Sequence, residues 1–294
     1  TAMKSRSKII SFLIFAVFLC GCAREKPAVS VSEPPDPGSR DIFSPVPVLG
    51  EFYKDPTIDQ EFCFCVPFMH DIGNETAERM NQIESAAVQG AEETLQVTEC
   101  SFSTSEFEEQ GCAYSVLTLY CRLPEEITDT IEVENLEIQA EGESYTFPVG
   151  KIVIHADYPR GDSVLSLKDR LGATFGRGLK LYGITFRNIS QEPVTLEKID
   201  LGVFAPYGPE VEVNGVAVDG TEGLAQEVPP GETIAIDIRF SEQPEGYETF
   251  LMGPLFTFRH GEDTVWGFAP PGSNGASPDD QDVQAIWESI KAKA

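Results

Sequence analysis

The sequence predicts a mainly β protein, in which two tandem β-sandwiches follow an N-terminal signal segment and tether and precede a C-terminal helix. From about residue 49 to 270, short alternating apolar runs are bounded by Gly, Pro, Asn and Asp. This pattern is typical of antiparallel strands rather than of alternating strands and helices. A span of roughly 220 residues suits two domains better than one. We expect these domains at residues 49–158 and 159–270.

A strand and hairpin pattern recurs in the two expected domains. Residues 113–123 and 232–240 each alternate apolar and polar side chains, and the two runs superpose at an offset of 117 residues. Residues 136–143 and 255–262 each run from a Leu through a strand-like segment to Gly-Glu, at an offset of 119 residues. The repetition favours two copies of one sandwich.

The second domain resembles a known architecture. In residues 184–196 a strand ends in Asn and a turn follows, and residues 228–236 open a later strand with Pro-Gly-Glu. Extracellular bacterial immunoglobulin-like modules share this order of features. The resemblance implies an immunoglobulin-like sandwich but no particular function, because such sandwiches host many functions. The expected strands are 179–188, 194–204, 211–218, 234–240, 250–259 and 264–268.

Two helices are expected beside the strands. Residues 77–91 carry apolar side chains at helical spacing, which predicts a short helix inserted in the first domain. Residues 271–294 begin as a linker, and Ser277 then precedes Pro278 and two acids, the pattern of a helix start. The expected helix has an apolar stripe made of Val283, Ile286, Trp287 and Ile290. We expect the stripe to pack on the second domain, and docking to a partner is the alternative.

The N-terminus resembles a bacterial lipoprotein signal peptide. A positively charged start precedes the apolar run 9–19, which is too short to span a bilayer. The tetrapeptide Leu19-Cys20-Gly21-Cys22 then matches the lipobox pattern in its Leu and Gly, and departs from it at Cys20. The resemblance implies cleavage of residues 1–21, lipidation of Cys22 and an extracytoplasmic position at the cell envelope. Residues 22–48 are rich in Pro and are expected to form an extended tether.

The composition is strongly acidic, with 48 Asp and Glu against 21 Lys and Arg. A polyanion repels nucleic acid, so we expect none to bind. Residues 51–150 hold 22 acidic and three basic side chains, whereas a basic cluster follows at the domain junction. Its members are Arg160, Lys168, Arg170, Arg177, Lys180 and Arg187. We interpret this cluster as a docking patch for the chain's own acidic domain or, alternatively, for an anionic wall polymer.

Five cysteines lie in the first domain, and an extracytoplasmic address would permit disulfides. They are Cys63, Cys65, Cys100, Cys112 and Cys121. On a strand, Cys63 and Cys65 face the same side and do not readily bond each other. Their partners therefore stay open, with Cys100–Cys121 one pairing among many, and the five are either disulfides or structural thiols. A spacing of one residue does not suit zinc, so we expect no metal and no cofactor.

The sequence carries no enzyme signature. It has three histidines and no Gly-x-Ser-x-Gly elbow. His70 and Asp71 are adjacent, but neighbouring side chains on a strand point apart. We therefore expect a non-catalytic binding or assembly module at the cell envelope, whose partner is an envelope protein or a wall polymer. The alternative is a hydrolase or enzyme-accessory lipoprotein whose site is assembled from residues distant in sequence.

The anchor is directly testable. Changing Cys22 to Ala removes the acyl attachment site, and each buried acyl methylene contributes about 0.8 kcal/mol to membrane binding. We expect the Cys22→Ala protein to leave the detergent-extracted membrane fraction and to lose its acyl label, while Cys20→Ala keeps both. An acyl label that persists in Cys22→Ala would exclude lipidation at this residue.

Overall fold

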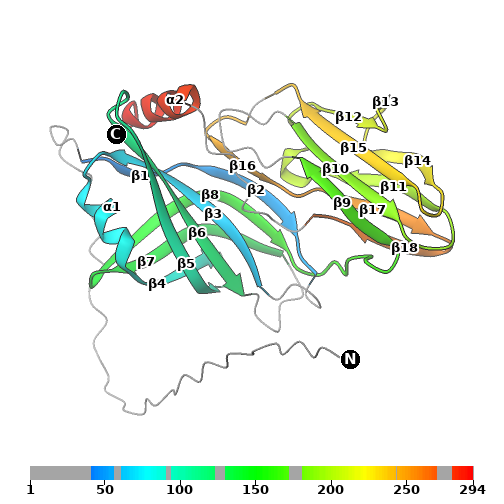
Figure 1. The fold of residues 1–294 in the computed structure, drawn as a ribbon, viewed down its shortest axis with the longest axis horizontal. Helices are drawn as coiled ribbons and strands as arrows, with labels where there is room; N and C mark the ends of the chain where they lie inside the picture. The colour runs from blue at the N-terminus through cyan, green and yellow to red at the C-terminus, as the bar shows by residue number, and fades with distance from the viewer. Residues whose placement is uncertain are drawn as a thin grey trace, which may run out of the picture. The chain divides into compact units, whose positions relative to one another are not determined.

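The computed structural model describes residues 41–55, 61–90, 94–122, 130–171, 181–242, 244–269 and 280–293. The signal segment, Cys22 and most of the tether lie outside these residues. The described residues belong to one unit, Pro37–Ala294, and strands dominate it (Figure 1). The mainly β fold is confirmed, whereas the boundary between the two domains stays a prediction.

Within the described ranges, nine strands form the first sheet in the order β1-β3-β6-β5-β4-β7-β8-β2-β16 (Figure 1). Their bounds are β1 (Phe43–Pro45), β2 (Val48–Tyr53), β3 (Glu61–Asp71), β4 (Ile83–Gly90), β5 (Thr94–Phe107), β6 (Cys112–Arg122), β7 (Thr130–Ala140), β8 (Glu143–His155) and β16 (Thr249–Met252). β1 lies within the span that was assigned to the tether. It is an edge strand, a position that tolerates its Pro45.

The first sheet curls so that β1, at one edge, lies close to β8 near the other edge. β1 pairs antiparallel with β3, and β2, which follows after two residues, pairs in parallel with β8. The ring of Phe147 on β8 lies 5.5 Å from that of Phe43 and 5.2 Å from that of Phe68. The apolar side chains of one face thereby form a common interior, which includes Leu117 and Ile138. The first region therefore encloses its core with one sheet, and not with the two separate sheets expected from the sequence.

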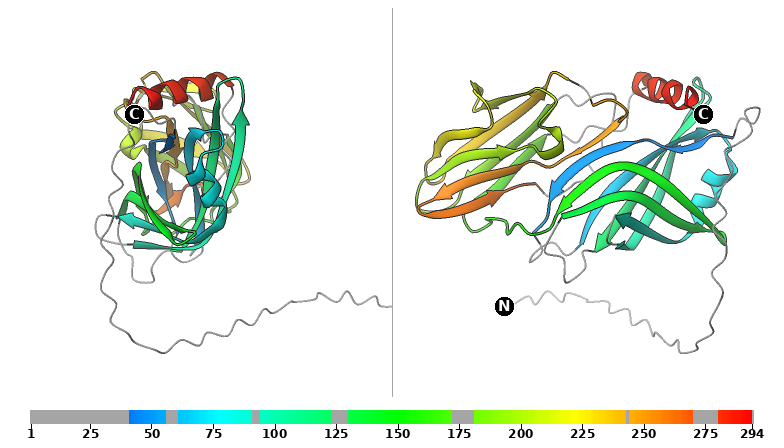
Figure 2. Two further views of the ribbon diagram at one scale, coloured as in Figure 1. Left: turned by 90° about the vertical axis from the view of Figure 1, so that its left-hand side faces the viewer. Right: turned by 180° about the vertical axis from the view of Figure 1, so that it is seen from behind.

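The remaining strands form two further sheets in the part of the chain that is described. One has the order β13-β12-β15-β10-β9 and the other β14-β11-β17-β18. Their bounds are β9 (Leu165–Leu171), β10 (Leu181–Asn188), β11 (Val194–Asp200), β12 (Pro209–Val213), β13 (Val216–Val218), β14 (Glu222–Val228), β15 (Thr233–Phe240), β17 (Leu255–His260) and β18 (Asp263–Gly267). Figure 2 shows these strands from two further directions.

These two sheets share one apolar core, as a β-sandwich does. Phe186 of β10 contacts Phe256 and Phe258 of β17, with ring centroids 5.3 and 5.7 Å apart. The neighbours β9-β10-β15 and β11-β17-β18 reproduce the A-B-E and C-F-G groupings of an immunoglobulin-like sandwich. The sandwich predicted for the second region is confirmed.

The strand expected at 250–259 is divided into β16 and β17. Gly253 and Pro254 separate them, and β16 pairs in parallel with β2 of the first sheet. A side chain at Gly253 would place its Cβ 2.8 Å from the Cβ of Phe52, so glycine permits this close approach. Neither β9 nor β14 is among the strands expected from the sequence.

The prediction of a helix at residues 77–91 is largely wrong. The structure has α1 (Glu75–Arg79), capped by the Asn74 side chain, and a 3₁₀ turn η1 (Met80–Gln82). Residues 83–90 form β4, which lies between β5 and β7. Apolar spacing alone did not separate a helix from a strand in this short run, and pairing on both sides favours the strand.

The C-terminal helix α2 (Asp280–Lys291) is present, but its cover differs from the expected one. Val283, Ile286, Trp287 and Ile290 are buried with residues of the first sheet and the β1–β2 connection, among them Val46, Met69 and Tyr114. The second region therefore does not cover the stripe. The reason is that the outer face of β3 and β6 is apolar at this end. Among the described residues, no helix is long and apolar enough to cross a membrane.

The packing of α2 predicts a stability effect. Trp287 is 3% exposed, and replacing a buried Trp by Ala costs about 3 kcal/mol because a cavity remains. We expect Trp287→Ala to lower the free energy of unfolding in urea by that amount. Gln284→Ala, on the exposed side of the same helix, is the matched control and should change it by less than about 0.5 kcal/mol. Equal effects of the two variants would contradict the packing.

Candidate functional site

Glu51, His155 and Thr130 form a hydrogen-bonded chain across three strands. His155 Nε2 lies 2.7 Å from Glu51 Oε1 on β2, and His155 Nδ1 lies 2.9 Å from Thr130 Oγ1 on β7. Thr130 is directly opposite His155 in the β7–β8 register, and Tyr53 is opposite it in the β2–β8 register. The sheet thereby connects a hydroxyl, an imidazole and a carboxylate by two successive hydrogen bonds. We call this set the junction relay.

The partners of His155 determine which ring nitrogen carries the proton. A carboxylate oxygen only accepts, so Nε2–H donates to Glu51. In the neutral imidazole, Nδ1 then carries no proton and accepts the hydrogen bond of the Thr130 hydroxyl. The imidazole is therefore oriented as a base toward Thr130.

Aromatic rings hold the imidazole in place. The Tyr53 ring stacks on His155 with centroids 4.6 Å apart, and Tyr158 meets it edge-on at 6.3 Å. Burial first, and then the charges of Asp200 and Glu51, raise the pKa of Tyr53 far above its usual range. Burial also raises the pKa of Tyr158, and Asp157 adds to the effect. Both tyrosines therefore stay neutral beside the relay.

Glu51 also binds the second region. Its other carboxylate oxygen accepts a hydrogen bond from the backbone N–H of Val203, in the 3₁₀ turn η2 (Gly202–Phe204). Gly202 has φ +47°, and a Cβ there would lie 2.0 Å from the Glu51 carboxylate. Only glycine fits this approach without displacing the carboxylate. Both oxygens of Glu51 are thus hydrogen-bonded, which a buried carboxylate requires.

A second histidine network lies inside the curled sheet. His70 Nδ1 donates to the Asp71 carbonyl at 2.9 Å, and His70 Nε2 accepts from Ser115 Oγ at 2.8 Å. Thr104 Oγ1 completes it at 2.7 Å from Ser115 Oγ. Burial lowers the pKa of His70, against the opposing effect of its bond to Asp71. The Asp71 carboxylate instead accepts from Ile42 N–H, so the two adjacent side chains point apart as expected.

All five cysteines of the first region are free thiols. Burial raises the pKa of Cys121 to about 12, and that of Cys112 to about 11 with Lys291 opposing part of the shift. Thiols with such values carry little thiolate and react slowly. Cys63 and Cys65 share the outer face of β3, and Cys65 Sγ lies 3.5 Å from Thr118 Oγ1. Of the two alternatives, the structure contains the structural thiols; Cys100 is half-buried on the opposite face.

The basic cluster expected at the domain junction does not form a single patch among the residues that the structure describes. The guanidinium of Arg160 pairs with Asp162 at 2.7 Å, and Arg187 Nε donates to the Gly231 carbonyl at 2.8 Å. Lys168 is exposed on β9, which also contains Arg170. Arg177 and Lys180 lie outside the described residues. The fit of the acidic region to this cluster stays a prediction. One contact is seen there: the Asp55 carboxylate accepts a hydrogen bond from the backbone N–H of Arg160.

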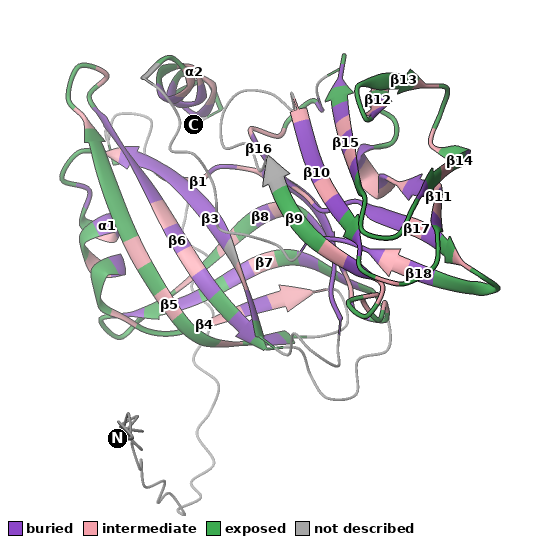
Figure 3. Ribbon diagram, turned by 45° about the vertical axis from the view of Figure 1, so that its right-hand side comes forward, coloured by how far each residue is buried: buried purple, intermediate pink, exposed green. Residues whose placement is uncertain are grey.

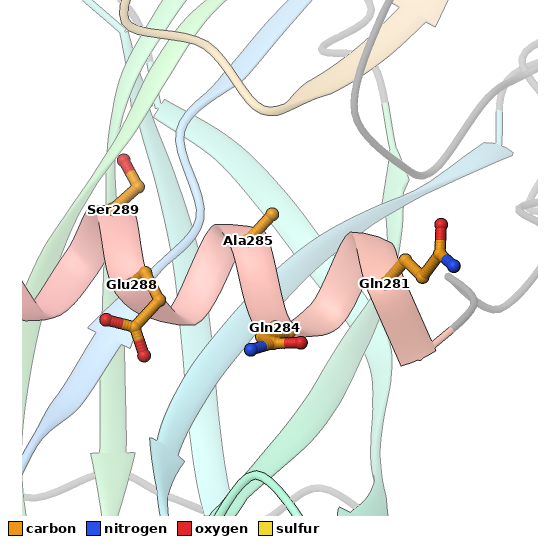
Figure 4. A pocket seen from close by; sticks show the side chains of 5 residues that line it. All are labelled: Gln281, Gln284, Ala285, Glu288 and Ser289. Atoms are coloured by element: carbon orange, nitrogen blue, oxygen red, sulfur yellow. The ribbon is translucent and has the colours of Figure 1, made fainter.

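A hollow on α2 is lined by fewer potentially reactive groups than the junction relay contains. Its lining residues are Gln281, Gln284, Ala285, Glu288 and Ser289, all from the polar side of one helix (Figure 4). These residues include no histidine and no thiol. In the described part of the chain, no group of three or more His, Cys, Asp or Glu side chains is arranged to hold a metal ion.

Sequence reasoning missed the junction relay. Glu51 and His155 are 104 residues apart, and no motif spacing connects them. One signal was present: Glu51 is a single acid inside the apolar run 48–53, all six residues of which are buried. An acid in a strand buried on both faces needs a partner.

Comparison with known proteins assigns neither a family nor a function. No family model and no curated protein matches the chain. A marsupial T cell receptor structure aligns at 10% identity and a TM-score of 0.23, covering 79% of this chain and 96% of the receptor chain. Domains 4–9 of the surface layer protein SbsC align at 12% identity and a TM-score of 0.20, covering 81% of this chain and 32% of that one. At these TM-scores neither likeness supports a conclusion about fold or function.

The approach of Gly202 to Glu51 predicts a specific defect. We expect Gly202→Ala to lower the free energy of unfolding by more than about 2 kcal/mol, because the new Cβ displaces a buried, paired carboxylate. Gly215→Ala is the matched control, since Gly215 has φ +75° with no atom within 4 Å of a Cβ; its backbone strain alone costs about 1 kcal/mol. Equal losses in urea unfolding would show that contact with Glu51 is unimportant.

Proposed function

We propose that this chain is a lipid-anchored extracytoplasmic protein that acts as a binding or assembly module at the cell envelope. The observation that carries the proposal is an open polar area on the outer face of the first sheet, which we call the hydroxyl face. It consists of Ser101 and Ser103 on β5 and Thr118 and Tyr120 on β6. Tyr120 is 40% exposed although its strand neighbours are fully buried.

The register brings these side chains together. Ser101 is directly opposite Thr118, and Glu99 is directly opposite Tyr120. Side chains at such positions share a face, because residues alternate between the two sides of a strand. Figure 3 shows exposed and half-buried residues along most of β5. The hydroxyl face offers hydrogen-bond donors and acceptors together with one aromatic ring.

The charge around the hydroxyl face restricts the class of partner that it could bind. Glu99 lies beside the hydroxyl face, opposite Tyr120, and Arg122 beyond Tyr120 is paired with Glu61. No uncompensated cation among these residues would attract an anionic polymer, and the chain as a whole carries a formal charge of −27. Hydroxyl groups and an exposed tyrosine suit an uncharged glycan, to which they offer hydrogen bonds and ring contact. The proposed partner is therefore the glycan strand of the cell wall.

Co-sedimentation with purified peptidoglycan, freed of anionic polymers, tests this proposal. We expect the wild-type protein to sediment with the polymer and Tyr120→Ala to bind about tenfold more weakly, because loss of the ring contact costs about 1.4 kcal/mol. The double variant S101A/T118A should weaken binding similarly. Ser144→Ala with Thr146→Ala removes two exposed hydroxyls from the outer face of β8 and should bind as wild type does.

Two outcomes would contradict the proposal. The first is an absence of sedimentation with peptidoglycan, which would direct the search to an envelope protein. The second is binding that Tyr120→Ala and S101A/T118A leave unchanged, which would place the contact elsewhere on the chain.

A further inference from the structure

The junction relay has the order of exposure that a nucleophilic site requires. The side chain of Glu51 is 8% exposed and that of His155 19%, while Thr130 is exposed. The residue with the hydroxyl is thus at the surface and the orienting carboxylate is inside. The His70–Ser115 pair has similar chemistry, but Ser115 is fully buried, and a substrate does not reach it.

We propose that the junction relay is an acyl-transfer site that cleaves carboxylic esters. Thr130 is the nucleophile, His155 is the general base, and Glu51 is a positioning residue that acts through His155. The two hydrogen bonds, at 2.9 and 2.7 Å, lie within the reach that such groups need. This activity goes beyond the proposed binding function, and its residues do not belong to the hydroxyl face.

The reaction proceeds in two balanced steps. Thr130 Oγ attacks the ester carbonyl carbon while its proton passes to His155 Nδ1, and Glu51 stabilises the resulting imidazolium through Nε2–H. The tetrahedral intermediate expels the alcohol, which takes the proton from Nδ1 and leaves an acylated Thr130. Water then attacks this ester with His155 again as base, and the departing Thr130 oxygen receives the proton as the acid is released.

The surroundings select the substrate class. Asp157, Asp200 and Glu51 act electrostatically on Tyr158 or Tyr53, and Lys198, which lies 3.5 Å from Asp200, offsets part of this charge. With three carboxylates against one ammonium, these groups together disfavour anionic donors. Tyr158 is half-buried and offers an aromatic wall beside the base. The class expected is therefore an uncharged carboxylic ester.

Glu51→Gln separates positioning from a merely structural role. The backbone N–H of Val203 needs an acceptor, so the amide oxygen of Gln would face it and the amide NH₂ would face His155 Nε2. Nε2 must then accept, and the ring proton moves to Nδ1, where it blocks proton abstraction from Thr130. The variant keeps both hydrogen bonds of residue 51 but reverses the tautomer of His155.

The experiment treats the detergent-purified full chain with p-nitrophenyl acetate and maps the acetylated residues by mass spectrometry. We expect release of nitrophenolate with acetylation of Thr130. The rate at Thr130 should fall at least about 100-fold in His155→Gln and in Glu51→Gln, the range that a general base contributes. Thr130→Val should carry no acetyl group at this position. Thr98→Val, which removes an exposed hydroxyl bonded to the Tyr120 carbonyl, is the matched control and should react as wild type does.

The melting temperatures of the same variants test whether a loss of rate reflects unfolding. Retained melting temperatures with lost acetylation support the relay. Three results would overturn the proposal: acetyl groups only on residues other than Thr130, acetylation of Thr130 at equal rates in wild type and His155→Gln, or an unchanged rate in Glu51→Gln.

Discussion

The structure depends on one short segment, residues 43–53, which pairs with both ends of a sheet. Its first half is hydrogen-bonded to β3, and its second half lies in parallel between β8 and β16. A side chain at Gly150, which has φ +103°, would place its Cβ 2.2 Å from the Val48 carbonyl oxygen. The segment thus approaches β8 so closely that only glycine fits. Closure of the first core and attachment of β16 both follow from this pairing.

The polar residues follow from the same constraint. A strand with neighbours on both sides and both faces covered is normally apolar throughout, and Glu51 is the exception in β2. Its desolvation is offset by His155 and by the backbone N–H of Val203. Because these partners come from the sheet and from η2, the carboxylate connects the two regions. The same bonds that stabilise the junction also orient the imidazole toward Thr130.

Local patterns predicted the strands well but not their partners. Apolar and polar side chains alternate clearly in residues 113–123 and 232–240, where β6 and β15 lie. The two strands nevertheless belong to different kinds of sheet, β6 to the curled first sheet and β15 to the sandwich. Alternation states which side chains share a face and not which strand is adjacent. Residues 77–91 show the opposite error, since a short apolar run fits either period and its neighbours β5 and β7 decide it. The relay required the pairing of β2 with β8, a contact between residues about 100 apart, and so no local pattern revealed it.

The outer face of the first sheet has two parts of different character, an apolar part under α2 and the hydroxyl face. Tyr114 and Met69 are directly opposite each other, as are Thr118 and Cys65 further along the same two strands. The apolar pair lies under α2, because the stripe of that helix needs an apolar surface to exclude water. Thr118 and Tyr120 offer hydroxyl groups instead, so covering them with Trp287 and its neighbours would remove polar groups from water. The apolar end of the face is therefore the part that α2 covers, and the hydroxyl face stays uncovered by it.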